Sequence, residues 1–303
     1  MIYNRRFFLK AASAAAAGTL VWPLASCSQS GNQSDGSADS LGTAGSRGSM
    51  TTIPDFGIQL YSARDIIGKD PRGVLKQLAD MGYKKVESYQ GDQGVFWGMS
   101  PKEFKGYLDE LRMTAVSTHA DTTKDLEKLA DEAAEAGLTY VLQPYIGAQP
   151  SLDEWKKRAE EFNQRGEVCK KAGVKFGYHN HDYSFRAVDG QVPQELLLES
   201  TDPGLVVYEL DILWIEAAGV DAETHFKKYA GRYDLCHIKD LVREPEPHST
   251  DLGQGQINYA KVLRTAADNG VKHFIVEQEH YPESVLKSLA NDADYMKQLV
   301  LQG

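Results

Sequence analysis

Four short segments of the chain carry acidic or basic residues that stand two positions apart. They are His179-Asn180-His181, Glu209-Leu210-Asp211, His237-Ile238-Lys239 and Glu277-Gln278-Glu279. Because side chains alternate along a β-strand, the two outer residues of each segment would share one face. If these faces point inward, imidazoles and carboxylates are buried together, and leaving them without partners would be costly. A divalent cation is the simplest common partner for such a group.

We predict that this cation is bound by one residue from each segment. The predicted ligands are His179, Asp211, His237 and Glu277. Two nitrogens and two carboxylate oxygens suit zinc, manganese or cobalt better than calcium. For each residue taken alone, the alternative is an ordinary hydrogen-bonded polar side chain at the end of a strand. The occurrence of all four together favours the metal.

The elements that must position these residues repeat in the order strand, then helix. From Thr51 onward, short apolar runs alternate with longer amphipathic stretches, and we count eight such pairs. The predicted strands are Phe56–Leu60, Lys84–Ser88, Thr114–His119, Tyr140–Tyr145, Val174–His181, Leu205–Asp211, Leu235–Lys239 and His273–Glu279. The predicted helices include Pro71–Met81, Pro101–Leu111, Leu126–Ala136, Leu152–Lys171 and Ser284–Leu301.

Residues 51–303 are about as many as the roughly 250 of a (β/α)8 barrel, so we predict an α/β TIM barrel that forms a single domain. A doubly wound open sheet is the alternative fold, but no glycine-rich phosphate loop follows the first strand. In a TIM barrel the chemistry sits at the carboxyl ends of the strands. The four segments fall there, as does His119 at the end of the third strand.

The residues before the barrel have the composition of an export signal and a tether. Arg5-Arg6 precedes an apolar run that is too short to cross a bilayer, which resembles a twin-arginine signal. Leu24-Ala25-Ser26-Cys27 resembles a lipobox, so we expect Cys27 to carry a lipid. The expected parts are a signal peptide at 1–26, a Ser/Gly-rich tether at 27–50 and the barrel at 51–303. An exported lipoprotein, periplasmic or associated with the outer membrane, is expected.

The net charge limits which partners the protein can bind, and the cysteine content limits the disulfides it can form. The net charge is −10, and removing Arg5, Arg6 and Lys10 with the signal makes it −13. A protein with this negative charge would be repelled by the phosphates of nucleic acid, so we expect no nucleic-acid partner. We expect contact with the membrane only through the lipid on Cys27. Three cysteines are too few for a disulfide scaffold, so Cys169 and Cys236 are expected to be buried free thiols.

The polar segments together resemble a known family. Gly177-Tyr178-His179-Asn180-His181-Asp182, Glu209-Leu210-Asp211, Cys236-His237-Ile238-Lys239-Asp240 and Val276-Glu277-Gln278-Glu279 follow the order found in the sugar phosphate isomerase/epimerase superfamily, the xylose-isomerase-like barrels. The resemblance extends over residues 51–303. It implies one divalent metal ion (manganese, zinc, cobalt or magnesium) and a small carbohydrate substrate such as a ketose, inosose or related polyol. It also places Asp211, His237 and Glu277 at the family's Asp, His and final Glu ligands.

The fifth strand departs from the family pattern. Many of these epimerases have a ligand Glu that also acts as an acid or base where this chain has His179. The symmetric exchange of protons by two carboxylates is therefore in doubt. Exported members with a Tyr-His-Asn-His-Asp run resemble barrels that eliminate from 3-keto sugars or dehydrate inososes. We predict a metal-dependent isomerase or epimerase that removes a proton next to a sugar carbonyl through an enediolate, with a lyase sharing that first step as the alternative.

Residues around the predicted ligands receive roles in this reaction. Glu277 is the preferred base, with His181 next because imidazole titrates near neutrality. Lys239 either donates to a substrate oxygen or pairs internally with Asp211 or Glu279. Further substrate contacts are expected from His119 and Glu279 and from the aromatic residues Tyr61, Tyr89, Phe96, Trp97, Tyr145 and Trp214. The irregular segment Arg243–Gln256 is expected to cover the site.

Three other functions remain open at this point. A sugar-binding lipoprotein without activity would suit the export signal but would not need four metal ligands. A retaining glycoside hydrolase would use Glu209 and Glu277, with the carboxyl groups about 5 Å apart and no metal. An abasic-site endonuclease, a relative of the same barrel, would use a larger metal-ligand set and face DNA.

Overall fold

The structure of the protein, a computed structural model, describes residues 51–302. The predicted signal peptide and the whole of the predicted tether, with Cys27, lie outside the described residues. Within residues 51–302, no helix combines the length and the apolar character that a membrane span requires.

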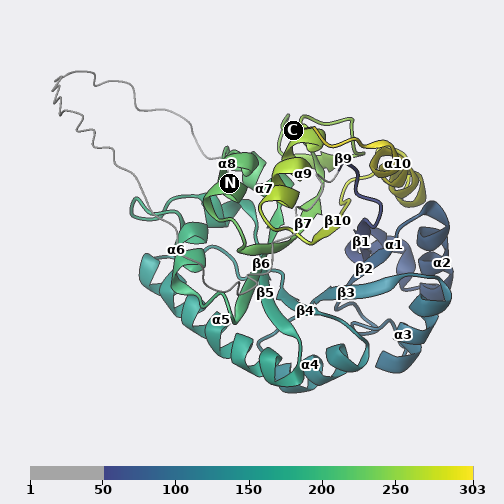
Figure 1. The fold of residues 1–303 in the computed structure, drawn as a ribbon, viewed down its shortest axis with the longest axis horizontal. Coiled ribbons are helices and arrows are strands. Elements are labelled where there is room, and N and C mark those ends of the chain that lie inside the picture. The colour runs from purple at the N-terminus through teal and green to yellow at the C-terminus, as the bar shows by residue number, and fades with distance from the viewer. Residues whose placement is uncertain (1–50, 303) are drawn as a thin grey trace, which may run out of the picture. The chain divides into compact units, whose positions relative to one another are not determined.

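Eight parallel strands close into a barrel in the order β1-β10-β7-β6-β5-β4-β3-β2 (Figure 1). They are β1 (Gly57–Gln59), β2 (Lys85–Tyr89), β3 (Thr114–His119), β4 (Tyr140–Gln143), β5 (Lys175–His179), β6 (Val206–Asp211), β7 (Tyr233–Ile238) and β10 (His273–Val276). Hydrogen bonds between β1 and β10 complete the ring. The predicted (β/α)8 barrel is therefore confirmed, and the open doubly wound sheet is excluded.

The helices form an outer layer around these strands (Figure 1). The α-helices are α1 (Arg64–Ile67), α2 (Pro71–Met81), α3 (Pro101–Glu110), α4 (Leu126–Glu135), α5 (Leu152–Ala172), α6 (Pro193–Ser200), α7 (Ile212–Ala217), α8 (Ala222–Lys228), α9 (Tyr259–Asp268) and α10 (Val285–Gln298). Two short 3-10 helices, η1 (Leu60–Ala63) and η2 (Asp182–Phe185), follow β1 and β5. Local signals explain the boundaries: α2 begins after the N-cap Asp70 and ends at Gly82, which adopts a left-handed conformation.

Several predicted strands end earlier than expected, among them the fifth and the last. The last strand was predicted to reach Glu279, but β10 ends at Val276. The N–H of Glu277 still donates to the Ile238 carbonyl of β7, whereas the N–H of Glu279 donates to the Ser249 hydroxyl. The chain thus leaves the sheet at Glu277 because a loop side chain takes over as hydrogen-bond acceptor. β5 also ends early, at His179 rather than His181.

The predicted irregular segment Arg243–Gln256 is partly regular. Within it, β9 (His248–Thr250) pairs antiparallel with β8 (Asp240–Val242). The Asp240 carboxylate accepts backbone N–H groups from Leu241, Gly253, Gly255 and Ile257, at 2.9 to 3.2 Å. This one buried carboxylate therefore holds the start and the end of the segment between β7 and α9 together.

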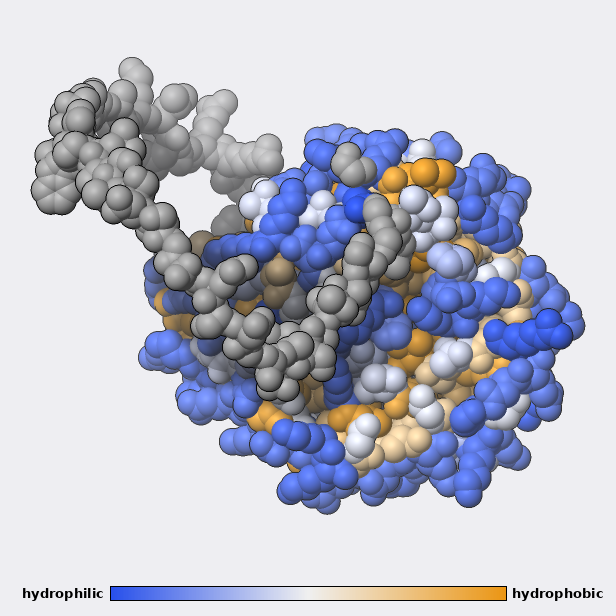
Figure 2. Space-filling view, viewed as in Figure 1, coloured by the Kyte–Doolittle hydropathy of each residue, from blue (hydrophilic) through white to orange (hydrophobic). Residues whose placement is uncertain are grey.

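Two apolar cores support the polar residues. A large core lies mainly between strands and helices, and a smaller cluster contains Val116, Tyr140, Leu142, Val207 and Leu235. Val207 and Leu235 precede Glu209 and His237 by two residues, so they share the inward face and form an apolar layer next to the polar one. Cys169 and Cys236 are buried free thiols, as predicted. Figure 2 shows that hydrophilic residues dominate the outer rim of the visible face.

Gly166 sets how closely the long helix α5 approaches β6. A Cβ at this position would lie 2.6 Å from the carbonyl oxygen of Leu205 and 2.8 Å from its Cβ. Gly106 in α3 is the matched contrast, because a Cβ there would meet nothing within 4 Å. The same substitution should therefore have opposite effects in the two helices.

We predict that Gly166→Ala lowers the free energy of unfolding by about 1–3 kcal/mol, because the backbone of Leu205 must move away. Gly106→Ala should raise the free energy by up to about 1 kcal/mol through helix propensity alone. Urea unfolding followed by circular dichroism measures both. A Gly166→Ala protein as stable as the parent would mean that α5 does not sit this close to the sheet.

Candidate functional site

The four predicted ligands meet at the carboxyl ends of their strands. One ring nitrogen each of His179 and His237 and one carboxylate oxygen each of Asp211 and Glu277 lie within 4.8 Å of one another. All four residues are buried. Hence β5, β6, β7 and the residue after β10 bring together two nitrogen and two oxygen donors, which we call the outer donor group. This set has the composition that transition-metal ions prefer.

Asp211 is held so that one of its oxygens is available. It is the last residue of β6 and the N-cap of α7, where Oδ1 accepts the Trp214 N–H at 3.0 Å. The side chain of Asn180 accepts the N–H of Asp211 at 3.0 Å and thereby ties β6 to the end of β5. Oδ2 makes no hydrogen bond of good geometry to any residue between 51 and 302, and its charge partner is the Lys239 ammonium, whose Nζ lies 3.0 Å away. A buried carboxylate oxygen without a directional hydrogen bond keeps lone pairs that a metal ion could use.

Lys239 lies beside the outer donor group. Its Nζ is 3.0 Å from Asp211 Oδ2 and 2.6 Å from Glu277 Oε2, and it also pairs with Glu279. The Tyr259 hydroxyl accepts the N–H of Lys239 and donates to its carbonyl. Burial lowers the pKa of Lys239, but the three carboxylates outweigh burial and hold it well above its usual value. The internal pairing that the sequence left open is thus present, with an ammonium ion in the site.

A second polar layer lies next to the outer donor group, and the sequence analysis did not identify its centre, Glu87 on β2. Glu87 Oε1 is 2.6 Å from His237 Nε2 and 3.1 Å from His119 Nε2. The carboxylate also accepts hydrogen bonds from the side chains of Gln59 and Ser117, at 2.7 and 2.5 Å. An acidic residue in the middle of a buried strand was the available signal for it.

Glu209 on β6 completes this inner layer. Its Oε2 is 2.8 Å from His119 Nε2, 3.0 Å from His179 Nδ1 and 3.2 Å from His237 Nε2. Together with one nitrogen of each histidine it forms a second compact set of potential metal donors. Glu209 is fully buried and does not line the cavity described below. This burial argues against a glycoside hydrolase that uses Glu209 and Glu277.

Charge in the inner layer is divided between its members. Burial would raise the pKa of Glu87, but His119 and His237 hold it well below its usual value. Burial and the Glu87 carboxylate raise the pKa of Glu209 to about 7. Against its burial, Glu87 and Glu209 raise the pKa of His119 to about 9. Burial holds the pKa of His179 well below its usual value, so His179 is neutral and keeps one free lone pair.

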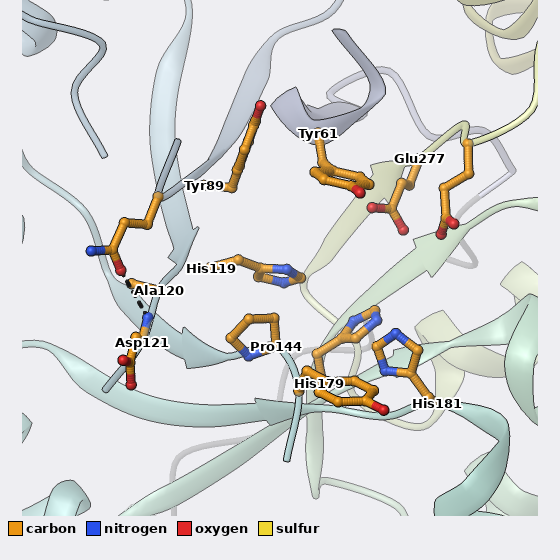
Figure 3. Close-up of a pocket in the computed structure, with 12 residues that line it drawn as sticks. Tyr61, Tyr89, His119, Ala120, Asp121, Pro144, His179, His181 and Glu277 are labelled. Carbon is orange, nitrogen blue, oxygen red and sulfur yellow. Dashed lines mark hydrogen bonds between the residues drawn. The ribbon is translucent and has the colours of Figure 1, made fainter. Parts of the chain in front are cut away.

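A cavity of about 390 Å³ opens beside the donors. Figure 3 shows His119, His179, His181 and Glu277 around this space, with Tyr61 across from the histidines. The predicted substrate-binding residues that line it are His119, Glu279, Tyr61, Tyr89 and Tyr145. Its size is within the range of small-molecule sites.

Three predicted aromatic contacts lie elsewhere. Trp214 lines a neighbouring cavity with Lys239, although its ring stacks 5.6 Å from that of His181. Trp97 lines an adjoining cavity instead of this one. Phe96 belongs to the apolar core, where it packs against Phe104.

His181 lines the cavity but differs from the expected near-neutral imidazole. Burial and the nearby ammonium of Lys239 lower its pKa to about 3. Its Nδ1 is buried and has no hydrogen-bond partner within the described chain. His181 is therefore neutral at physiological pH and carries a lone pair.

Comparisons with known proteins agree with this architecture. Residues 75–299 match the family model for the xylose isomerase-like TIM barrel. An inosose dehydratase from Clostridium perfringens is 27% identical over 160 residues, covering 47% of this chain and 52% of that protein. The chain thus spans about half the length of the curated relatives it matches.

Solved structures with the same barrel include two from named bacteria. A sugar phosphate isomerase/epimerase from Parabacteroides distasonis superimposes with a TM-score of 0.70 and 25% identity, over 85% of this chain and 96% of that one. A probable 3-DHS dehydratase from Bacillus anthracis shares the fold, with a TM-score of 0.66 and 14% identity over 80% and 99% of the two chains. The family model covers most of the sequence, and the closed barrel carries its polar residues at the expected strand ends. This chain therefore belongs to the xylose isomerase-like TIM barrel family.

Proposed function

We propose that the protein is a metal-dependent enzyme that removes a proton from the carbon next to the carbonyl of a sugar or inosose and so isomerises or epimerises it. The observation that carries the proposal is the outer donor group, which meets beside a cavity of about 390 Å³. A sugar-binding protein without activity would not need this buried set of four donors.

The residues of the outer donor group fit a divalent ion. His179, Asp211, His237 and Glu277 would hold it, and Asp211 Oδ2, which makes no hydrogen bond of good geometry within the described residues, supports this assignment. When bound, the ion would supply positive charge that stabilises negative charge on a substrate oxygen, which lowers the cost of removing a proton from the adjacent carbon. Zinc, manganese, cobalt and magnesium are the proposed candidates.

His181 is the proposed proton acceptor. The sequence favoured Glu277, but Glu277 Oε2 is engaged by Lys239 at 2.6 Å and by His237 at 3.0 Å. His181 lines the same cavity, lies outside the outer donor group and is packed between the rings of Tyr183 and Trp214. This packing fixes the imidazole plane, as a general base requires. Lys239 is the proposed proton donor to a substrate oxygen: it lines the neighbouring cavity and pairs with Glu277 and Glu279, which line this one.

Dehydration is the second candidate outcome. Inosose dehydratases are among the relatives of this chain. In addition, Lys239 lies between Asp211, Glu277 and Glu279, where an ammonium could protonate a departing hydroxyl. Both outcomes share the removal of the α proton.

We predict about one transition-metal ion per chain after purification with metal, measured by elemental analysis. His237→Ala and Asp211→Asn should each reduce the bound metal to a small fraction, because each removes a donor. His273→Ala, at the opposite end of β10, is the matched control and should retain the metal. Metal content that is near zero in the parent after reconstitution, or is unchanged in His237→Ala, would exclude this site.

The inner carboxylates should tune metal affinity without touching the metal. His179 Nδ1 lies 3.0 Å from Glu209 Oε2, and His237 Nε2 lies 2.6 Å from Glu87 Oε1. The other ring nitrogens, His179 Nε2 and His237 Nδ1, therefore face the outer donor group. We predict that Glu209→Gln and Glu87→Gln each weaken metal binding by about 10–100-fold. Chelator competition and the cobalt absorption spectrum measure this effect, with exposed Glu283→Gln as the control. Unchanged affinity in both variants would refute the positioning role.

The chemical step can be followed with solvent deuterium. During turnover of a ketose or inosose in deuterated water, deuterium should enter the α carbon of the isomerised product or of recovered substrate. His181→Asn should bind metal normally and lose roughly 10²–10⁴-fold in rate, the usual contribution of a positioned base. Isomerised product without deuterium would indicate a hydride shift and contradict the proposal. A product that has lost one molecule of water relative to the substrate would assign the reaction to dehydration.

A further inference from the structure

A second cavity adjoins the one beside the donors. Its volume is about 640 Å³, and Tyr89, Gln90 and Asp121 line both cavities. The N–H of Asp121 donates to Gln90 Oε1 at 2.9 Å, the hydrogen bond drawn in Figure 3. The two cavities therefore meet along these residues. A ligand seated beside the donors has room to extend past them.

The shared boundary carries an aromatic wall. The rings of Tyr61 and Tyr89 are 5.2 Å apart, and those of Tyr89 and Trp97 are 4.9 Å apart, both edge to face. Tyr61 belongs to the first cavity, Trp97 to the second and Tyr89 to both. Aromatic rings offer flat apolar faces, which suit the C–H side of a sugar ring. The wall thus continues from one cavity into the other.

Trp97 is held in place despite an unfavourable backbone. Its φ is 56°, in the left-handed region that a bulky residue rarely adopts. The indole N–H donates to the Ser88 hydroxyl at 3.2 Å, and a Cβ on Gly91 would lie only 2.5 Å from the indole ring. Such strain persists only where the surroundings enforce it, and it concentrates at ligand sites. The position of Trp97 in the wall of the second cavity is therefore enforced by its surroundings.

The polar lining of the two cavities suits hydroxyl groups better than phosphate. Among the described residues that line either cavity, Arg64 is the only arginine or lysine. Its guanidinium already donates to the Tyr281 hydroxyl and to the Glu279 carbonyl, both at 2.6 Å. The second cavity also presents the exposed Asp92 carboxylate. A phosphoryl group would find no uncommitted cation there, whereas amide and carboxylate groups can bind sugar hydroxyls.

We propose that the second cavity is a subsite for a second, uncharged sugar ring, so that the substrate is a glycoside or disaccharide whose reacting unit carries the carbonyl, instead of a free or phosphorylated monosaccharide. This rests on the proposed function, because the reacting ring is the one beside the donors. The second ring would pack against Tyr89 and Trp97 and hydrogen-bond to Gln90 and Asp92.

Gly68 allows the subsite to be blocked without disturbing the donors. It lines the second cavity alone, its φ of −63° and ψ of −19° suit any residue, and a Cβ there would meet nothing within 4 Å. Gly68→Phe should therefore place a ring in the cavity without backbone strain. Gly106→Phe is the matched control, since Gly106 is also helical, has open space around its Cβ and lies outside both cavities.

The test is calorimetric binding of cellobiose, maltose, trehalose, sucrose and lactose against glucose and glucose 6-phosphate, with metal-loaded protein. At least one disaccharide should bind about 10-fold more tightly than glucose, and glucose 6-phosphate should show no such gain. Gly68→Phe should bring the disaccharide-to-glucose ratio close to one, while Gly106→Phe keeps the parent ratio.

The subsite is overturned if no disaccharide binds more tightly than glucose or if Gly68→Phe leaves the ratio unchanged. Binding of glucose 6-phosphate more tightly than glucose would overturn the proposal that the ligand of the subsite is uncharged. Metal content and deuterium entry test the proposed function separately, because neither depends on this ratio. A ratio that responds to Gly68→Phe in a protein without metal would keep the subsite and reject the metal enzyme.

Discussion

The site depends on keeping charge balanced among ionisable side chains that have almost no contact with water. Glu87, Glu209 and Asp211 are fully buried, and so is His237 between them. A lone buried carboxylate would take up a proton or destabilise the fold. Here every carboxylate has an imidazole or an ammonium within 3.0 Å. Removing any one charged group leaves its partner buried and unpaired, so these residues constrain one another more than apolar neighbours would.

The barrel meets this constraint by fixing the backbone wherever a charged side chain leaves a strand. Asn180 joins the ends of β5 and β6, Tyr259 holds both backbone groups of Lys239, and Ser249 receives the N–H of Glu279. Asp240 in turn anchors the loop that carries Ser249 back toward β10. The polar groups are therefore positioned by short hydrogen-bonded links between consecutive elements, whereas the apolar cores set only the distance between layers.

The sequence predicted the barrel and the convergence of the outer donors because both follow from the alternation of side chains between the two faces of nearly regular strands. Glu87 escaped prediction because its partners Ser117 and His237 stand 30 and 150 residues away in sequence. No local spacing reveals such a contact. Trp214 lines the neighbouring cavity for a different reason: α7 begins at Ile212 and turns the chain, so closeness to Asp211 in sequence does not place the indole in the cavity beside the donors.

The two donor groups share His179 and His237, and this sharing favours one cation over two. A neutral imidazole has one lone pair and one N–H. If His179 Nε2 and His237 Nδ1 face an ion in the outer group, their other nitrogens carry protons and donate to Glu209 and Glu87. An ion in the inner group would require the opposite tautomers and would withdraw both lone pairs from the outer group. Filling both groups together would need imidazolate rings. The outer group borders the cavity through His179 and Glu277, so substrate reaches that position. The inner group then acts as the hydrogen-bonded support that fixes which nitrogen each histidine presents.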